Sequence, residues 1–144
     1  MARRKSHISK QLSASDLTRL IEFMQPVYTE PDGEPKDNFT GILVTKARKI
    51  EHRVRLHDTL SNDFSISEMF FEVLYSEEYR TLSVNFEGLK IIEVIGTPVY
   101  LVGADTWGNL LIDTASTTYN EYEIMGFQEI GDRVGFRIQV QLWR

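Results

Sequence analysis

Apolar and polar residues alternate along several short stretches of this chain. The clearest stretch is Arg133–Trp143, in which one parity is held by Val134, Phe136, Ile138, Val140 and Leu142. The other parity carries mostly Arg and Gln, and this period of two is typical of an antiparallel strand with one buried face. No stretch keeps a 3.6-residue apolar repeat over twelve positions or more. The pattern therefore predicts an all-β protein.

Similar patterns, separated by turn residues, predict further strands. In the first, over residues 17–27, Ile21 and Phe23 share a parity with Val27, although Leu17, Leu20, Ile21 and Met24 also fit one face of a helix. We prefer the strand, because the run is short and is ended by Pro26 and an Asp-Gly turn. The remaining strands are expected within residues 39–49, 69–76, 81–86, 89–95, 98–103, 109–116 and 122–127.

These strands predict a small antiparallel β-barrel with long loops, a closed form that leaves no exposed sheet edge. The length of 144 residues suits one domain, which we place over residues 17–144 after a flexible basic arm over residues 1–16. The polar segment 46–68 has no clear strand at its centre and predicts a long loop. The segment 27–41 contains Pro31, Asp32-Gly33 and Pro35, which predict a hairpin connection.

Composition excludes several classes of protein. The chain has no cysteine, so disulfides and thiolate chemistry are absent, and its basic start lacks the apolar segment of a secretory signal. Residues 1–57 hold 11 Lys and Arg against 7 Asp and Glu, a net +4, whereas residues 58–144 hold 5 against 14, a net −9. This polarity suits head-to-tail association or a basic surface facing nucleic acid, unless folding interleaves the two halves.

The densest cationic run is a candidate for contact with phosphates. It comprises Lys46, Arg48, Lys49, Arg53 and Arg55. No aromatic residues interleave with these cations, so stacking on single-stranded bases is not expected. The alternative is that the run forms a solvated face or an ordinary protein contact.

Motifs for metal binding or catalysis are missing. His52 and His57 do not have the i, i+4 spacing of a helical zinc pair, and no third histidine lies near them. The chain also lacks a Gly-x-Ser-x-Gly elbow and a phosphate-binding loop. We therefore expect no enzyme activity, no cofactor and no metal.

Several aromatic residues lie in polar surroundings, where Tyr and Trp are favoured in protein interfaces. The candidates for a subunit interface are Trp107, Tyr119, Tyr122 and Trp143. Equally, these side chains can cap the ends of the barrel.

The segments RLIEFMQPVYTEPDGEPKDNF and FFEVLYSEEYRTLSVNFEGLKIIEVIG, with a strand between them, together resemble the tailed-phage head–tail joining family, the head-closure or stopper proteins of the phage neck. The family layout has a first strand ending in a polar residue, a Gly-containing loop, a second strand, a long loop, a third strand and then an F-x-G turn. Its features match Gln25, Asp32-Gly33, Val73–Ser76 and Phe86–Gly88, over roughly residues 17–103. The chain departs from the family at Phe39, where a Trp is common, and residues 105–144 have no counterpart.

The resemblance implies a β-barrel subunit of a homo-oligomeric ring in the virion neck, made in the host cytoplasm. Such a ring docks on the portal and its adaptor, receives the tail terminator or tail tube, and closes the DNA channel. The long loop, here residues 46–68, would project toward double-stranded DNA and contact its backbone. The arm would dock on the connector through Arg3, Arg4, Lys5 and Lys10.

Two alternatives remain open. The chain can be another neck or tail ring, a tail terminator or an adaptor, although its strand content argues against the mostly helical adaptors. It can also be a small nucleic-acid-binding barrel of the OB type, which would need aromatic residues among the basic ones on a sheet face.

Overall fold

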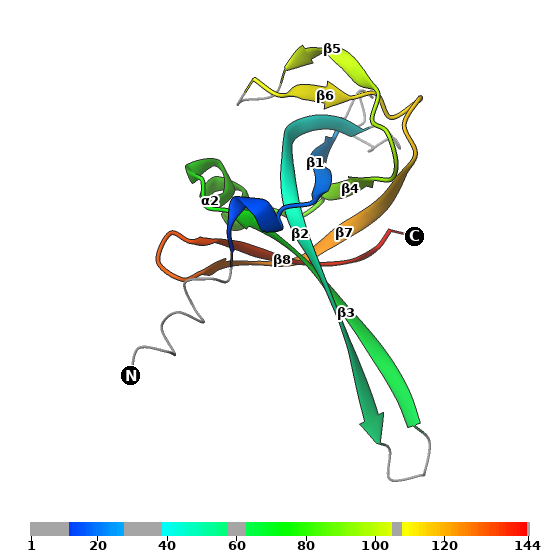
Figure 1. Ribbon diagram of the computed structural model, residues 1–144, viewed down its shortest axis with the longest axis vertical. Coiled ribbons are helices and arrows are strands. Elements are labelled where there is room, and N and C mark those ends of the chain that lie inside the picture. Colours follow the sequence, from blue (N-terminus) through cyan, green and yellow to red (C-terminus); the bar gives the residue numbers. More distant parts are fainter. Residues whose placement is uncertain (1–11, 28–38, 58–62, 105–107, 144) are drawn as a thin grey trace, which may run out of the picture.

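A computed structural model describes residues 12–27, 39–57, 63–104 and 108–143. Six strands form a closed antiparallel barrel, with each strand paired to its neighbours in the order β1-β2-β3-β8-β7-β4 and β4 paired back to β1 (Figure 1). These strands are β1 (Arg19–Pro26), β2 (Phe39–His57), β3 (Asp63–Leu74), β4 (Lys90–Val94), β7 (Tyr119–Ile130) and β8 (Gly135–Leu142). The prediction of a small all-β barrel is confirmed.

The barrel interior holds the main core, and the alternation on β8 sets its inward face as expected. Phe136, Ile138 and Val140 are buried, whereas Leu142 at the strand end is 58% exposed. Burial of large apolar side chains of this kind supplies most of the favourable free energy of folding. The other core residues are contributed mainly by β1, β2, β3, β4 and β7, among them Ile21, Phe23, Leu43, Phe71, Val73, Ile91 and Ile124.

One end of the barrel is closed by a helix where a strand was predicted. Residues 81–86 do not form a strand, because helix α2 (Glu77–Val84) occupies most of this segment. Ser76 caps the helix by accepting a hydrogen bond from the backbone N–H of Glu78, and two glutamates lie in the first turn, which favours a helix start. Tyr79 is 1% exposed and packs its ring 5.6 Å from that of Phe23.

A second, two-stranded sheet lies outside the barrel (Figure 1). It consists of β5 (Tyr100–Ala104) and β6 (Leu110–Ile112). A smaller core joins it to the barrel wall, because Ile112 packs with Val44 and Ile92, which lie on the outer faces of β2 and β4. The barrel wall is therefore buried on both faces in this region.

The predicted long loop over residues 46–68 is wrong, because β2 and β3 run through most of it. The two strands pair without interruption from Arg48↔Glu72 to His57↔Asp63. Apolar residues do alternate there, but the many charges between them hide the strand pattern. The connection over residues 58–62 lies outside the described residues, as do residues 28–38, although Pro26↔Phe39 pairing confirms an antiparallel β1–β2 hairpin.

The described chain begins with a packed segment. Leu12 is buried, and Ala14–Asp16 forms the short 3-10 helix η1, in which Asp16 accepts a hydrogen bond from the backbone N–H of Ser13. Residues 12–16 thus belong to the domain, whereas the predicted arm included them. Arg3, Arg4, Lys5 and Lys10 lie outside the described residues.

Candidate functional site

The feature that distinguishes this barrel is a ribbon that extends beyond it. The last pair between β3 and β8 is Met69↔Val140, and from His52↔Glu68 outward β2 and β3 pair with each other. We use the name ribbon for Arg53–His57 and Asp63–Ser67. Figure 1 shows it projecting away from the barrel on its own.

Only part of the predicted cationic run lies on the ribbon. Arg53 and Arg55 lie on the ribbon, where they hold register positions opposite Ser67 and Ser65. Lys46 is exposed on the barrel wall. The five predicted phosphate-contacting residues are therefore not brought together.

Arg48 and Lys49 have another role, and the prediction that they face DNA needs correction. Both lie at the base of the ribbon, and each binds a fully buried glutamate. Strand alternation sends Lys49 into the barrel and Arg48 to its outer face. A buried carboxylate needs a cationic partner, so both side chains are held within the domain.

Lys49 belongs to a polar network inside the barrel, at the opposite end from α2. Its Nζ donates to Glu93 Oε1 at 3.0 Å, and the hydroxyl of Tyr122 donates to the same oxygen at 2.9 Å. Arg19 Nη1 lies 3.3 Å from Glu93 Oε2. Glu93 is 0% exposed, so this network brings a carboxylate and two cations from β1, β2 and β4 to one end of the core.

Burial and hydrogen bonding shift two pKa values in this network. Burial by itself disfavours the charged form of Lys49, but its hydrogen bonds to Glu93 and Tyr122 outweigh that effect and raise its pKa above 10.5. Burial, followed by the hydrogen bond to Glu93, raises the pKa of Tyr122 above 10.0. Both groups therefore hold their protons more tightly in the folded protein than in the unfolded chain.

This linkage predicts a loss of stability in alkaline solution. Where the folded protein binds more protons than the unfolded chain, the free energy of unfolding falls as pH rises, here from about pH 10 upward. We expect Tyr122→Phe to flatten that fall in urea unfolding between about pH 8 and 11. Tyr100→Phe, at a residue that is 43% exposed, is the matched control and should keep the wild-type slope. Identical slopes in all three proteins would contradict the assignment.

Arg48 belongs to a second ion-pair group on the outer face of the barrel. It donates to Glu72 Oε1, while Arg137 Nε donates to Glu72 Oε2 at 2.7 Å. Glu72 is directly opposite Arg48 on β2 and opposite Arg137 on β8, so three neighbouring strands are tied by one carboxylate. Glu72 is 0% exposed, whereas the two arginine side chains are 28% and 38% exposed.

A third buried glutamate connects the barrel to the outer sheet. Glu22 on β1 is 0% exposed and accepts a hydrogen bond from the backbone N–H of Ile112 on β6 at 3.3 Å. Gly41 leaves space for it, because a Cβ at this position would lie 2.2 Å from Glu22 Oε2. All three buried glutamates follow two apolar residues and precede another, in the sequences LIEF, FFEV and IIEV. This pattern, a lone glutamate within an apolar run, is visible in the sequence and could have identified the three buried carboxylates.

The aromatic residues predicted to form a subunit interface lie in different surroundings. Tyr122 is 1% exposed inside the barrel, so its assignment to an interface is wrong; its ring packs against Phe71 and its hydroxyl binds Glu93. Trp143 is 38% exposed, and Lys90 Nζ lies 5.4 Å from its ring centre. Tyr119 is partly buried against the smaller core, and Trp107 lies outside the described residues.

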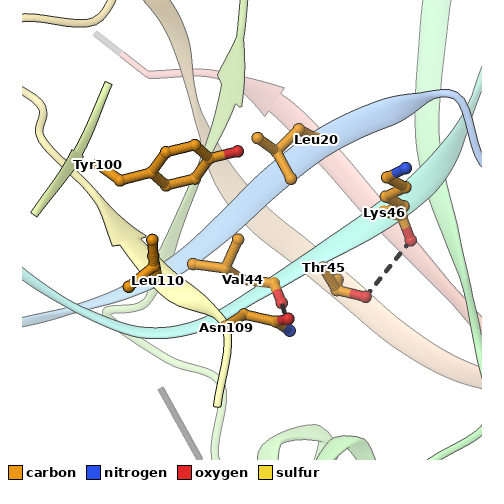
Figure 2. A pocket seen from close by; sticks show the side chains of 7 residues that line it. All are labelled: Leu20, Val44, Thr45, Lys46, Tyr100, Asn109 and Leu110. Atoms are coloured by element: carbon orange, nitrogen blue, oxygen red, sulfur yellow. Dashed lines mark hydrogen bonds between the residues drawn. The ribbon is translucent and has the colours of Figure 1, made fainter. Parts of the chain in front are cut away.

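A groove opens where the outer sheet meets the barrel wall (Figure 2). It has a volume of about 460 Å³, and Tyr100 and Leu110 of the outer sheet face Leu20 and Val44 of the wall across it. Asn109 donates a hydrogen bond to the backbone carbonyl of Val44 at 3.0 Å and fixes the position of β6 there. The groove is also lined by Thr45, Lys46 and Asn109.

The outer sheet beside this groove carries several exposed apolar residues. Tyr100, Leu101 and Leu110 are each between 43% and 49% exposed, and Val102 is 106% exposed. Exposed apolar side chains, where they form one contiguous patch, mark interaction sites on proteins.

Among the described residues, no three His, Asp or Glu side chains gather in the way a metal site requires, and no helix is long and apolar enough to cross a membrane. Comparisons with models of protein families, with curated proteins and with solved structures found no significant match.

Proposed function

We propose that this chain is a structural subunit of the head-closure ring in the neck of a tailed phage. The observation that carries the proposal is the ribbon, which extends beyond a closed barrel between its second and third strands. The head–tail joining resemblance assigns the channel-facing element to the same place in the chain. In this arrangement the ribbon projects toward DNA in the channel, and the barrels form the ring.

The positions of the ribbon cations support contact with a DNA backbone. Arg53 and Arg55 pair in strand register with Ser67 and Ser65, residues that carry guanidinium and hydroxyl groups. Such groups bind phosphate oxygens without reading the base sequence. A ring repeats the two arginines in every subunit, so a modest charge per chain becomes a band of positive charge around the channel.

The strand content and the ribbon sequence favour head closure over an adaptor and over an OB-type module. An adaptor is mostly helical, whereas α2 is a single helix of 8 residues and the described chain is otherwise mostly strands. An OB-type module would bind single strands by itself, and its bases would stack on aromatic side chains among the cations. The residues paired in register with Arg53 and Arg55 are serines and not aromatic residues.

Native mass spectrometry of the purified chain tests the proposal, with and without portal–adaptor complexes. We expect the chain to join the complexes as a ring of defined copy number. A chain that ignores the complexes and instead binds single-stranded DNA with steep salt dependence would favour the OB-type alternative.

The ribbon arginines give a second test. Replacing Arg53 and Arg55 by Ser should leave the domain folded but lower severalfold the fraction of assembled particles that keep their DNA, because phosphate contacts are lost. Arg80→Ser is the matched control: it removes a cation from α2, where Arg80 forms a surface ion pair with Glu129. Particles of the Arg53→Ser/Arg55→Ser variant that keep their DNA as well as the control would contradict a channel role for the ribbon.

A further inference from the structure

The groove between the outer sheet and the barrel wall is built from two separate sheets. Figure 2 shows the apolar side chains that lie around it, which are Leu20 and Val44 of the barrel and Tyr100 and Leu110 of the outer sheet. Its volume of about 460 Å³ lies within the range of pockets that bind small molecules, roughly 300–1,000 Å³. The groove therefore has room for the apolar part of a small ligand.

A lysine lies on the barrel side of this groove. Lys46 is directly opposite Leu20 in the β1–β2 register, and residues opposite each other on antiparallel strands share a face of the sheet. Lys46 is also two positions from Val44, so strand alternation places both side chains on the outer face of β2. The side chain of Lys46 is exposed and lines the groove. A positive charge thus lies beside an apolar surface.

This lysine has no anionic partner among the described residues. Of the Lys and Arg side chains that the structure describes, only Lys46 and Arg133 form no ion pair. The others pair with carboxylates, and they are Arg19, Arg48, Lys49, Arg80, Lys90 and Arg137. Arg133 lies in the turn between β7 and β8, whereas Lys46 is the one charged residue among those that line the groove. The groove is therefore complementary to an anion with an apolar body.

We propose that this groove binds a small amphipathic carboxylate. The apolar body of the ligand lies between the barrel wall and the outer sheet, and its carboxylate lies beside Lys46. Burial of apolar surface drives the binding, and the ammonium group selects the charge of the ligand. Because Lys46 is exposed, its ion pair contributes modestly to affinity. This binding site goes beyond the proposed function and does not depend on it.

Three ligands that share one alkyl chain and differ in charge test the site on the wild-type chain. They are octanoate, 1-octanol and octyltrimethylammonium. Two-dimensional NMR spectra recorded during titration report both the affinity and the residues in contact. We expect the signals of Leu20, Val44 and Leu110 to shift. Octanoate should bind roughly threefold to fivefold more tightly than 1-octanol, as an exposed ion pair allows, and octyltrimethylammonium should bind most weakly.

Variants then separate the charge of the groove from its apolar walls. Lys46→Gln should bind octanoate no better than 1-octanol, and Lys46→Glu should prefer octyltrimethylammonium to octanoate. Arg133→Gln is the matched control: it removes the other unpaired cation and should keep the wild-type preference. Leu110→Asn should weaken all three ligands alike by severalfold, because it removes apolar surface. Val84→Asn, at an exposed apolar residue of α2, should bind like the wild type.

Several results would overturn the proposal. They are shifts confined to another part of the domain, equal affinities of the wild type for octanoate and 1-octanol, and a Lys46→Gln variant that keeps the preference for the carboxylate. If the same signals shift with protein concentration in the absence of ligand, the groove is a contact between two copies of the chain, which also overturns it. None of these results bears on head closure, which is tested by assembly onto portal–adaptor complexes.

Discussion

Replacing Glu93 by Ala is expected to lower the free energy of unfolding by about 3–5 kcal/mol, because it leaves buried cationic and hydroxyl groups without their acceptor. Lys49 is the main cause, since its side chain is 19% exposed and its Nζ donates to Glu93 Oε1. Tyr122, 1% exposed, loses the same acceptor. Urea unfolding near neutral pH measures the change.

A double variant distinguishes the cost of an unpaired charge from the value of the pair itself. Lys49→Met/Glu93→Leu removes both charges and keeps apolar volume, so it should be more stable than Glu93→Ala, while the buried Tyr122 hydroxyl, now without its acceptor, keeps it below the wild type. Arg80→Ala is the surface control: its ion pair with Glu129 is partly exposed, and the loss should stay below about 1 kcal/mol. If Glu93→Ala costs no more than Arg80→Ala, the network does not stabilise the barrel.

Two ion pairs, made by Lys49 and Arg48, hold the strand at the base of the ribbon. Lys49 and Arg48 are adjacent on β2, and alternation places them on opposite faces of the wall. One is bound to Glu93 inside the barrel and the other to Glu72 outside it. The strand is thus held on both faces just before it leaves the barrel, and a projecting element needs this kind of fixed origin.

The alternation of apolar and polar residues along single strands correctly predicted part of the fold. On β8 it identified Phe136, Ile138 and Val140 as core residues, because this strand faces the interior on one side and carries Gln and Arg on the other. Where both faces of a strand are buried, the period of two disappears. Every residue of β4 is buried, because β4 lies between the interior core and the outer core.

The partners of the buried glutamates could not be predicted from the sequence for a related reason. A lone glutamate in a strand is normally placed on a solvated face, but Glu72 lies opposite two arginines that neutralise it, and Glu22 lies beneath β6. These partners are 24 or more positions away in the chain. Sequence pattern can place the glutamate within an apolar run, but only the strand register reveals which cation faces it.

Local charge and local capping account for the other errors. The β2–β3 ribbon was predicted as a loop because its charged and polar residues outnumber its apolar ones, although Val54, Leu56, Phe64 and Ile66 keep the strand period. Helix α2 has only 8 residues, too few for a convincing repeat, and its clearest signal is the cap at Ser76 followed by two glutamates.

Gly135→Ala is expected to destabilise the domain by about 3 kcal/mol, because there is no space for a side chain at this point of β8. An added Cβ would lie 2.3 Å from the backbone oxygen of Val73 and 2.5 Å from Leu12 Cδ2. A side chain such as that of Leu12 can rotate away, but the carbonyl belongs to β3, which pairs with β8 here. The strands must therefore move apart. Thermal and urea unfolding measure the loss.

Two further variants isolate the cause. Gly126→Ala on β7 adds a Cβ that meets Gln139 at ordinary contact distances of 3.7 and 3.8 Å, so it should be neutral or slightly stabilising by reducing the freedom of the unfolded chain. Leu12→Ala combined with Gly135→Ala removes the side-chain clash and leaves the backbone clash. If the double variant recovers the stability of Leu12→Ala alone, Leu12 sets the limit. If it does not, the β3–β8 pairing sets it, which is the outcome that the fixed carbonyl predicts.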